Sequence, residues 1–137
     1  MKPIEQMTDA KINREIAERR GWTHFYIRIA YGDQLWGISP ETLECLRAIG
    51  NSVTDGDYEA APDYHTWEHA GPLLEECTKP EMGRMELRWF NTGYGMVGTK
   101  VVGDQLCTWP SHAIQVYDRA TAAVTRAWLE WEREGDE

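Results

Sequence analysis

Apolar residues recur at helical spacing near both ends of the chain. Between Asp9 and Arg20 they fall on one helix face, with Thr8 as a favourable cap and Gly21 as a natural stop. A second stripe of this kind extends from Arg119 to Trp131, and Asp118 precedes it as a candidate cap. The pattern therefore predicts one amphipathic helix near the start of the sequence and another near its end.

Two further helices are expected between these. Ser39-Pro40-Glu41 combines a helix cap, a proline suited to the first turn and an acidic first-turn residue, and the apolar spacing then continues to Ile49. The stretch that follows Pro62 predicts a central helix. Pro72 lies inside this helix and should kink or restart it, because proline lacks the backbone N–H that an interior helical residue donates.

Several segments alternate between apolar and polar residues instead. The segment from Trp22 to Ala30 predicts a strand that buries Phe25, Ile27 and Ile29 on one face. Further strands, separated by turn residues, are expected at 34–38, 85–90, 96–102, 106–109 and 113–116. Because the connections late in the chain are short, that part of the sheet should be antiparallel.

These elements predict an α+β fold, with an antiparallel or mixed sheet of about 3–5 strands covered by about four helices. The length of 137 residues fits a single domain over residues 1–137. The polar, acidic stretch from Ser52 to Ala61 is the candidate mobile loop, and no other linker is long enough to separate domains.

The chain is acidic, with 23 Asp and Glu against 14 Lys and Arg and a formal net charge of −9. An acidic surface repels phosphate, which disfavours direct binding to nucleic acid or to an anionic membrane. The charge could serve solubility, or it could mimic nucleic acid towards a basic host protein. The sequence shows no signal peptide and no apolar run long enough to span a membrane, so a soluble, cytosolic protein is expected.

Three cysteines, Cys45, Cys77 and Cys107, are widely separated along the chain. Their odd number and their spacing argue against a disulfide framework and against a cysteine-based zinc site. No nucleophile with an adjacent base can be singled out, so we expect no catalytic residue among them.

Three blocks of sequence, in the order MTDAKINREIAERRGW, PDYHTWEHAGPLLEEC and ATAAVTRAWLEW, resemble phage proteins of the ABA-sandwich domain family and the related phage NinX-like proteins. The resemblance implies an α-β-α sandwich and a small phage or prophage accessory protein in the cytoplasm of the infected bacterial host. It implies no active site, and it favours accessory functions that include counter-defence against the host.

The segment His65-Thr66-Trp67-Glu68-His69 matches the pattern H-x-x-E-H. On a helix, His65 and His69 would stand one turn apart on one face, where both could bind zinc. Glu68 could then act as a base on a metal-bound water, and Asp63 could supply a third ligand. The alternative is that the two histidines lie on the wet side of a capped helix.

Glycines at 93, 95 and 98 match the pattern G-x-G-x-x-G of dinucleotide-binding proteins. Such a site requires a strand that leads into a helix. The residues after Gly98 have the pattern of a strand followed by a turn, so the glycines are expected to serve a hairpin.

The chain is rich in aromatic residues with a polar tip, with seven Trp and six Tyr against two Phe. Near predicted turns and helix starts these could form a pocket for a planar ligand such as a nucleotide base. The candidate ligand-binding residues are Trp22, Tyr26, Arg28, Trp36, Tyr64, Trp67, Trp89 and Tyr94. Arg28, Arg84, Arg88 or Lys100 could meet phosphates. The alternative is that these rings pack the sheet against the helices.

Together, these features favour a non-enzymatic phage or prophage accessory protein that binds a host protein in counter-defence. A binder that sequesters a small nucleotide signal is the first alternative. A small metal-dependent hydrolase built on His65, Glu68 and His69 is the second, and zinc would be its only cofactor. A homo-oligomer is compatible with all three hypotheses.

Overall fold

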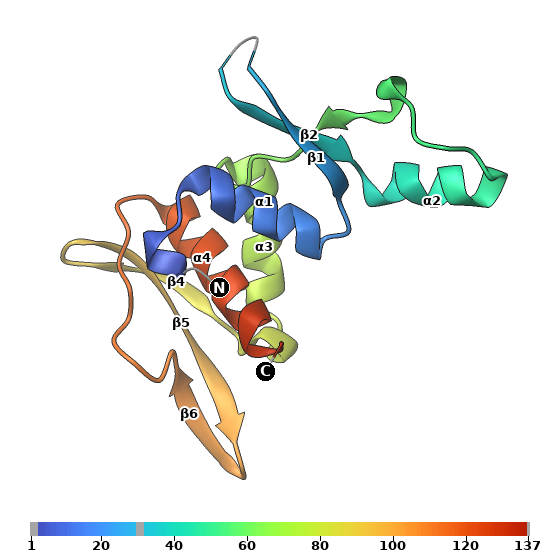
Figure 1. Ribbon diagram of the computed structural model, residues 1–137. Helices are drawn as coiled ribbons and strands as arrows, with labels where there is room; N and C mark the ends of the chain where they lie inside the picture. Colours follow the sequence, from blue (N-terminus) through green and yellow to red (C-terminus); the bar gives the residue numbers. More distant parts are fainter. Residues whose placement is uncertain (1–2, 30–31, 137) are drawn as a thin grey trace. The chain divides into compact units, whose positions relative to one another are not determined.

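The computed structural model describes residues 3–29 and 32–136 and confirms the α+β class (Figure 1). Within these residues, four α-helices are α1 (Asp9–Arg19), α2 (Pro40–Ile49), α3 (Trp67–Cys77) and α4 (Ala120–Glu134). The strands form two antiparallel three-stranded sheets rather than one. They are β1 (Thr23–Arg28), β2 (Gln34–Ile38), β3 (Glu59–Ala60), β4 (Glu86–Phe90), β5 (Gly93–Val102) and β6 (Gln105–Trp109). Single 3-10 turns are η1 (Ile4–Gln6), η2 (Asp55–Asp57) and η3 (Pro80–Met82).

The chain divides into two compact units. Unit 2 consists of Asn13–Asp63, and unit 1 combines the residues up to Ile12 with those from Tyr64 onwards. The first and last residues of unit 2 are joined directly, since the side-chain amide of Asn13 donates to Oδ1 of Asp63 over 3.0 Å. The single domain and the α-β-α layering stay predictions.

Helix α4 forms the centre of unit 1. All residues from Thr121 to Leu129 are buried, so this helix is enclosed on every side rather than only along the predicted apolar face. It packs against α3, whose Leu73 and Cys77 are fully buried, and against β5. Small residues on α4 such as Ala123 permit these close contacts.

The glycines of β5 belong to a hairpin with β4, as the sequence predicts, with Phe90 opposite Gly93. They also let other backbone segments approach the sheet. A side chain at Gly98 would lie 2.8 Å from the carbonyl oxygen of Gly83, and one at Gly93 would overlap the carbonyl of Tyr117. The predicted strand at 113–116 is wrong, because this segment is held at β5 only by an isolated bridge between Tyr94 and Tyr117.

Unit 2 holds the sheet β1-β2-β3 and helix α2. The side chain of Ser39 accepts from the backbone N–H of Thr42, and Gly50 ends α2 in the left-handed conformation, so the predicted start and stop are confirmed. The segment predicted as a mobile loop contains η2 and β3. A capping box between Thr54 and Asp57 closes η2, which explains its regular structure.

Burial in unit 2 is sparse. Among its described residues only Ile16, Ala17, Gly37, Ile38 and Ser39 are buried, and α2 contributes none. The predicted buried face of β1 is wrong, since Ile27 is 51% exposed and Ile29 75% exposed, while Phe25 is half-buried. The last predicted residue of that strand, Ala30, lies outside the described residues.

Two predicted helix starts are also wrong. Helix α3 begins at Trp67 with Thr66 before it, so His65 precedes the helix instead of lying one turn before His69 on it. The N-cap position of α4 is occupied by Arg119, whose side chain makes no capping hydrogen bond, and Asp118 lies one residue before it. Pro72 is accommodated inside α3, which continues to Cys77.

Candidate functional site

Four residues of unit 2 form what we call the aromatic surface: Tyr26, Arg28, Trp36 and Tyr58. Tyr26 lies directly opposite Trp36 in the β1–β2 pair, with ring centroids 6.4 Å apart. The ring of Tyr58 meets that of Tyr26 edge-on at 5.1 Å. The guanidinium of Arg28 lies 4.4 Å above the centroid of the Trp36 ring, a cation–π contact.

Strand periodicity places these side chains together. Residues two apart share a sheet face, so Tyr26 and Arg28 lie on the face that also carries Trp36. The indole N–H of Trp36 donates to Oε1 of Gln34 over 3.1 Å, which fixes the ring. On the opposite face Gly37 leaves room for Phe25, because a Cβ there would lie 3.2 Å from the Phe25 ring.

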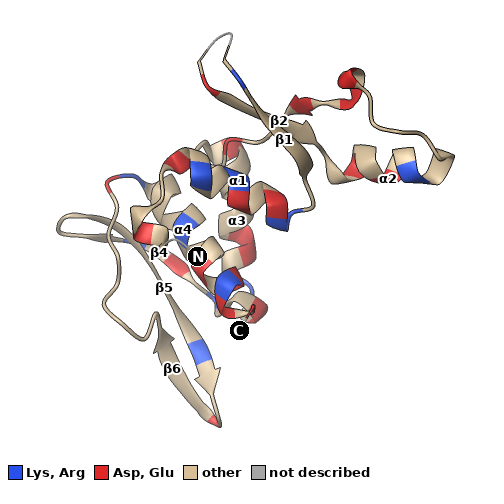
Figure 2. Cartoon of the chain, in the orientation of Figure 1, with Lys and Arg blue, Asp and Glu red and all other residues tan. Residues whose placement is uncertain are grey.

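The aromatic surface is open to solvent at its centre and acidic beside it. Tyr26 is 42% exposed. The neighbours of Tyr58 along the chain include Asp55, Asp57 and Glu59 (Figure 2). Asp57 accepts the backbone N–H of Thr54 at 2.8 Å, whereas Asp55 and Glu59 lie in exposed positions. The surface therefore combines polarisable rings with negative charge.

A second aromatic pair lies in unit 1. Trp89 of β4 and Tyr94 of β5 are directly opposite each other, with centroids 4.8 Å apart in an edge-on arrangement. Trp89 is 64% exposed. No third ring contact extends this pair among the described residues, so it offers a smaller surface than the one in unit 2.

The other predicted ligand-binding residues occupy separate places. Tyr64 is buried and meets the ring of His69 edge-on at 6.1 Å, which is a packing role. Trp67 is exposed as the first residue of α3, and Trp22 is half-buried after α1. The structure thus brings together Tyr26, Arg28 and Trp36 from the predicted set.

Two of the cations predicted to meet phosphates are paired with carboxylates. Nζ of Lys100 lies 2.8 Å from Oε2 of Glu134, and Arg88 pairs with Glu86. Arg28, another of these cations, contacts the predicted aromatic residue Trp36 in the aromatic surface.

His65 belongs to a buried polar network in unit 1. Its side chain is 5% exposed, and its Nε2 lies 3.1 Å from Nη1 of Arg126. A guanidinium can only donate, so Nε2 of His65 is the acceptor in this contact. Arg126, 8% exposed, also donates to Oδ1 of Asp9 over 2.8 Å, and the same carboxylate bonds Arg119 over 2.6 Å.

This network bears on the predicted metal ligands. His69 lies within α3 with its Nε2 3.9 Å from Glu68, and Asp63 belongs to unit 2, where it accepts from Asn13. Within the described part of the chain, no group of three or more His, Cys, Asp or Glu side chains is arranged to hold a metal ion. A metal at Nε2 of His65 would have to displace the Arg126 guanidinium.

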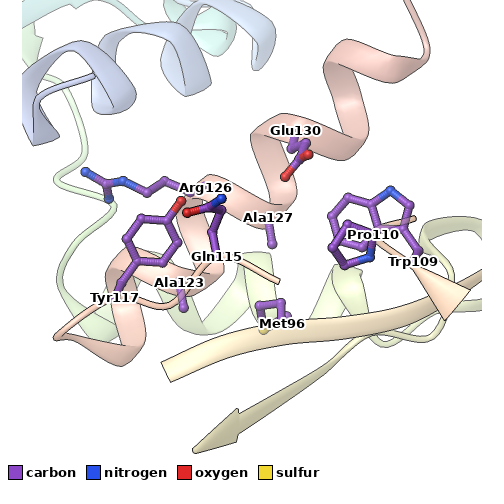
Figure 3. Close-up of a pocket in the computed structure, with 9 residues that line it drawn as sticks. All are labelled: Met96, Trp109, Pro110, Gln115, Tyr117, Ala123, Arg126, Ala127 and Glu130. Carbon is purple, nitrogen blue, oxygen red and sulfur yellow. The ribbon is translucent and has the colours of Figure 1, made fainter. Parts of the chain in front are cut away.

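A small cavity of about 20 Å³ lies between α4 and the segment after β6 (Figure 3). Met96, Trp109 and Ala127 give it apolar walls, while Gln115, Tyr117, Arg126 and Glu130 add polar groups. Burial raises the pKa of Tyr117 to about 12, so its phenol is neutral at physiological pH. The volume suits about one water molecule, far less than a nucleotide base needs.

A wider hollow of about 220 Å³ in unit 1 is lined by Ile4, Arg133 and three carboxylates, Glu5, Glu130 and Glu134. Burial raises the pKa of Glu130, and Glu134 and Glu5 raise it further against the opposing effect of His112. Three acidic groups around one hollow disfavour a phosphate-bearing ligand.

Sequence reasoning missed Tyr58 and the Arg126 network. Tyr58 lay in the stretch interpreted as a mobile loop, although Thr54 and Asp57 have the spacing of a capping box and could have indicated local structure. Arg126 lies within the predicted helix but outside its apolar stripe, and 117 residues separate it from Asp9, so no local signal links them.

The chain was compared with protein-family models, curated proteins and solved structures. No family model matches the chain, and neither a curated protein nor a solved structure matches it. Every helix in residues 3–29 and 32–136 is too short or too polar to span a membrane. The resemblance to phage ABA-sandwich proteins therefore stays a prediction.

Proposed function

We propose that this chain is a non-enzymatic binding protein that captures a host protein through the aromatic surface of unit 2. The observation that supports the proposal is the contact group of Tyr26, Trp36 and Tyr58 with Arg28 on an open sheet. Tyr, Trp and Arg are the residues most enriched among those that dominate binding energy at protein interfaces.

The sparse core of unit 2 supports the same proposal. Five buried residues give this unit little apolar stabilisation of its own, while Tyr26 at the centre of the aromatic surface is 42% exposed. Apolar surface left open in this way is typical of a site that another molecule covers. A partner would bury the rings and add to the stability of the unit.

The charge around the surface supports a basic partner. Acidic side chains at Asp55 and Glu59 flank Tyr58, and the whole chain has a net charge of −9. A contact region with Lys or Arg side chains would pair with these carboxylates and stack its cations on the exposed rings. We therefore propose a basic protein surface as the target, and counter-defence on behalf of a phage as the role.

The test compares the native chain with Trp36→Ala, and uses Trp89→Ala as a matched control because it removes an exposed indole of unit 1. The proteins are immobilised and exposed to bacterial host lysate, and captured proteins are identified by mass spectrometry. We expect one basic protein to be retained by the native chain and by Trp89→Ala but lost with Trp36→Ala. Capture that is equal for all three would contradict the proposal.

A second measurement addresses the role. Bacteria with an active antiviral defence are infected while they express each variant. Native protein and Trp89→Ala should raise the phage titre, and Trp36→Ala should not. A titre unchanged by the native chain would remove counter-defence while leaving the binding proposal to the capture experiment.

The two alternatives lack a comparable supporting observation. A nucleotide would bring phosphates next to the acidic side chains beside Tyr58, and a hydrolase would need His65 to leave Arg126. Thermal-shift screening with cyclic and linear nucleotides tests the first, and metal analysis of the purified protein tests the second.

A further inference from the structure

Strand β1 forms an open edge of the unit 2 sheet. In the described residues it pairs with β2 alone, so the N–H and C=O groups on its other side have no strand partner. Such an edge is a template for one more strand. The side chains along it are also open to solvent, with Tyr26 42%, Ile27 51% and Ile29 75% exposed.

The usual protection of an edge strand is scarce here. Proline, lysine and acidic side chains prevent edge-to-edge pairing in many sheets, and residues 23–29 contain none of them. A register irregularity occurs only at the start of the strand, between Thr23 and Tyr26. His24, in the irregular part, has a φ of 58°, and the strand is regular from Tyr26 to Arg28, where it ends. Its one formal charge is Arg28.

We propose that two copies of this chain join β1 to β1 in antiparallel orientation, about a two-fold axis that passes through Ile27. The result is one continuous six-stranded sheet. This interface goes beyond the aromatic surface, because it uses the edge of the sheet and leaves the face with Trp36 and Tyr58 uncovered.

The register follows from symmetry and charge. A two-fold axis between antiparallel strands stands perpendicular to the sheet and keeps each side chain on its own face, so it must pass through a residue pair of equal number. An axis at Arg28 would place two guanidiniums opposite each other, and an axis at Tyr26 would place Arg28 opposite His24, which lies in the irregular part of the strand with a φ of 58°. Like charges opposite each other destabilise a strand pair.

An axis at Ile27 avoids both conflicts. Ile27 then meets Ile27 of the second copy, Arg28 lies opposite Tyr26, and Phe25 lies opposite Ile29. Apolar residues meet on one face, and a cation meets an aromatic ring on the other, where each Arg28 already lies over Trp36. The strand is thus complementary to a copy of itself in this register.

Net charge gives the interface a salt dependence. Each copy carries −9, so the two chains repel each other over long range, and added salt screens that repulsion. The dimer should therefore tighten as ionic strength rises. A complex with a basic partner should weaken under the same change, so the two kinds of association can be told apart.

Analytical ultracentrifugation tests the dimer with two matched variants. Ile27→Glu places two carboxylates opposite each other at the axis, whereas Ile49→Glu adds the same charge at an isoleucine of α2 that is 67% exposed. We expect a dimer for the native chain and for Ile49→Glu, and at least a ten-fold weaker dimer for Ile27→Glu. Circular dichroism checks that both variants fold.

Three results would overturn the inference: a native chain that stays monomeric at about 100 μM in high salt, a dimer that survives Ile27→Glu, or equal weakening by both variants. Disulfide trapping then tests the register, with Cys45 and Cys107 first replaced by serine. Ile27→Cys should cross-link with itself, and Tyr26→Cys should cross-link with Arg28→Cys, because opposite residues lie within disulfide range. Trapping that favours Arg28→Cys with itself would refute the axis at Ile27.

Discussion

The buried network of Arg126 offers the sharpest test of what holds unit 1 together. The change is Asp9→Asn, which keeps the shape of the side chain but removes the charge that faces two guanidiniums at 2.8 Å and 2.6 Å. Arg126 is 8% exposed, so it would remain largely buried with its main counter-charge gone. His65 cannot compensate, because its Nε2 already accepts from Arg126.

The magnitude follows from burial. Removal of one partner from a fully buried ion pair costs about 3–5 kcal/mol. The Asp9 side chain is 42% exposed, and asparagine retains one acceptor oxygen, so water and the amide recover part of that loss. We expect a free energy of unfolding lower by about 2 kcal/mol and a melting temperature lower by about 10 °C for a unit of this size.

The effect should depend on pH. Burial raises the pKa of Asp9, but hydrogen bonds from Arg126 and Arg119, with the charge of Arg119, lower it more, and the resulting pKa lies below the usual value. A lowered pKa means that the carboxylate stabilises the fold above its unfolded pKa, and that this advantage is lost as pH falls through the folded value. The difference between the native chain and Asp9→Asn should therefore be full above about pH 5 and shrink as the pH falls below about 4.

The assay is thermal unfolding followed by circular dichroism between pH 2.5 and pH 7. Glu86→Gln is the control, because it also removes a carboxylate paired with an arginine of unit 1, but both side chains there are more than half exposed. That control should cost under about 0.5 kcal/mol. Equal shifts for Asp9→Asn and Glu86→Gln, or a difference that does not shrink between pH 5 and pH 2.5, would refute the reasoning.

Three further predictions concern packing and reactivity. Leu73→Ala removes a fully buried side chain of α3 and should cost about 2–5 kcal/mol in chemical denaturation, while Trp67→Ala on the same helix, 53% exposed, should cost under about 1 kcal/mol. Gly98→Ala would place a methyl group 2.8 Å from the Gly83 carbonyl and should cost about 1–3 kcal/mol, whereas Gly56→Ala meets nothing within 4 Å and should melt within a few degrees of the native chain. Burial raises the pKa of the Cys77 thiol to about 12, so mass spectrometry after brief alkylation at pH 8 should find the exposed Cys45 modified and Cys77 intact. Rapid labelling of Cys77 in folded protein would contradict that burial.

Local signals in the sequence were sufficient to predict an element when residues close along the chain determine where it begins and ends. Helix α2 is an example, because Ser39, Pro40 and Gly50 set its ends through contacts within a few residues. The hairpin at Gly93 is another. Burial was not predictable in this way. The alternation in β1 indicates a strand, but which face is covered depends on distant segments, and Ile27 and Ile29 are open.

In the candidate site, too, local contacts could be predicted from the sequence and burial by distant segments could not. Tyr26, Arg28 and Trp36 were among the predicted ligand-binding residues, and a short hairpin brings them together. Tyr64 was chosen on the same grounds, yet tertiary packing buries it. Likewise, the H-x-x-E-H spacing has its helical meaning only if both histidines lie on the helix, and α3 begins two residues after His65.

The hydrogen bond between Asn13 and Asp63 has an evolutionary consequence. The place where the chain enters unit 2 and the place where it leaves are held side by side, which is the arrangement that tolerates grafting of a whole module into a host fold. A lineage could exchange residues 13–63 for another sequence that continues helix α1 at its start and has similarly adjacent ends, while the central helix of the host fold stayed intact. Target choice could then diversify faster than the scaffold that carries it.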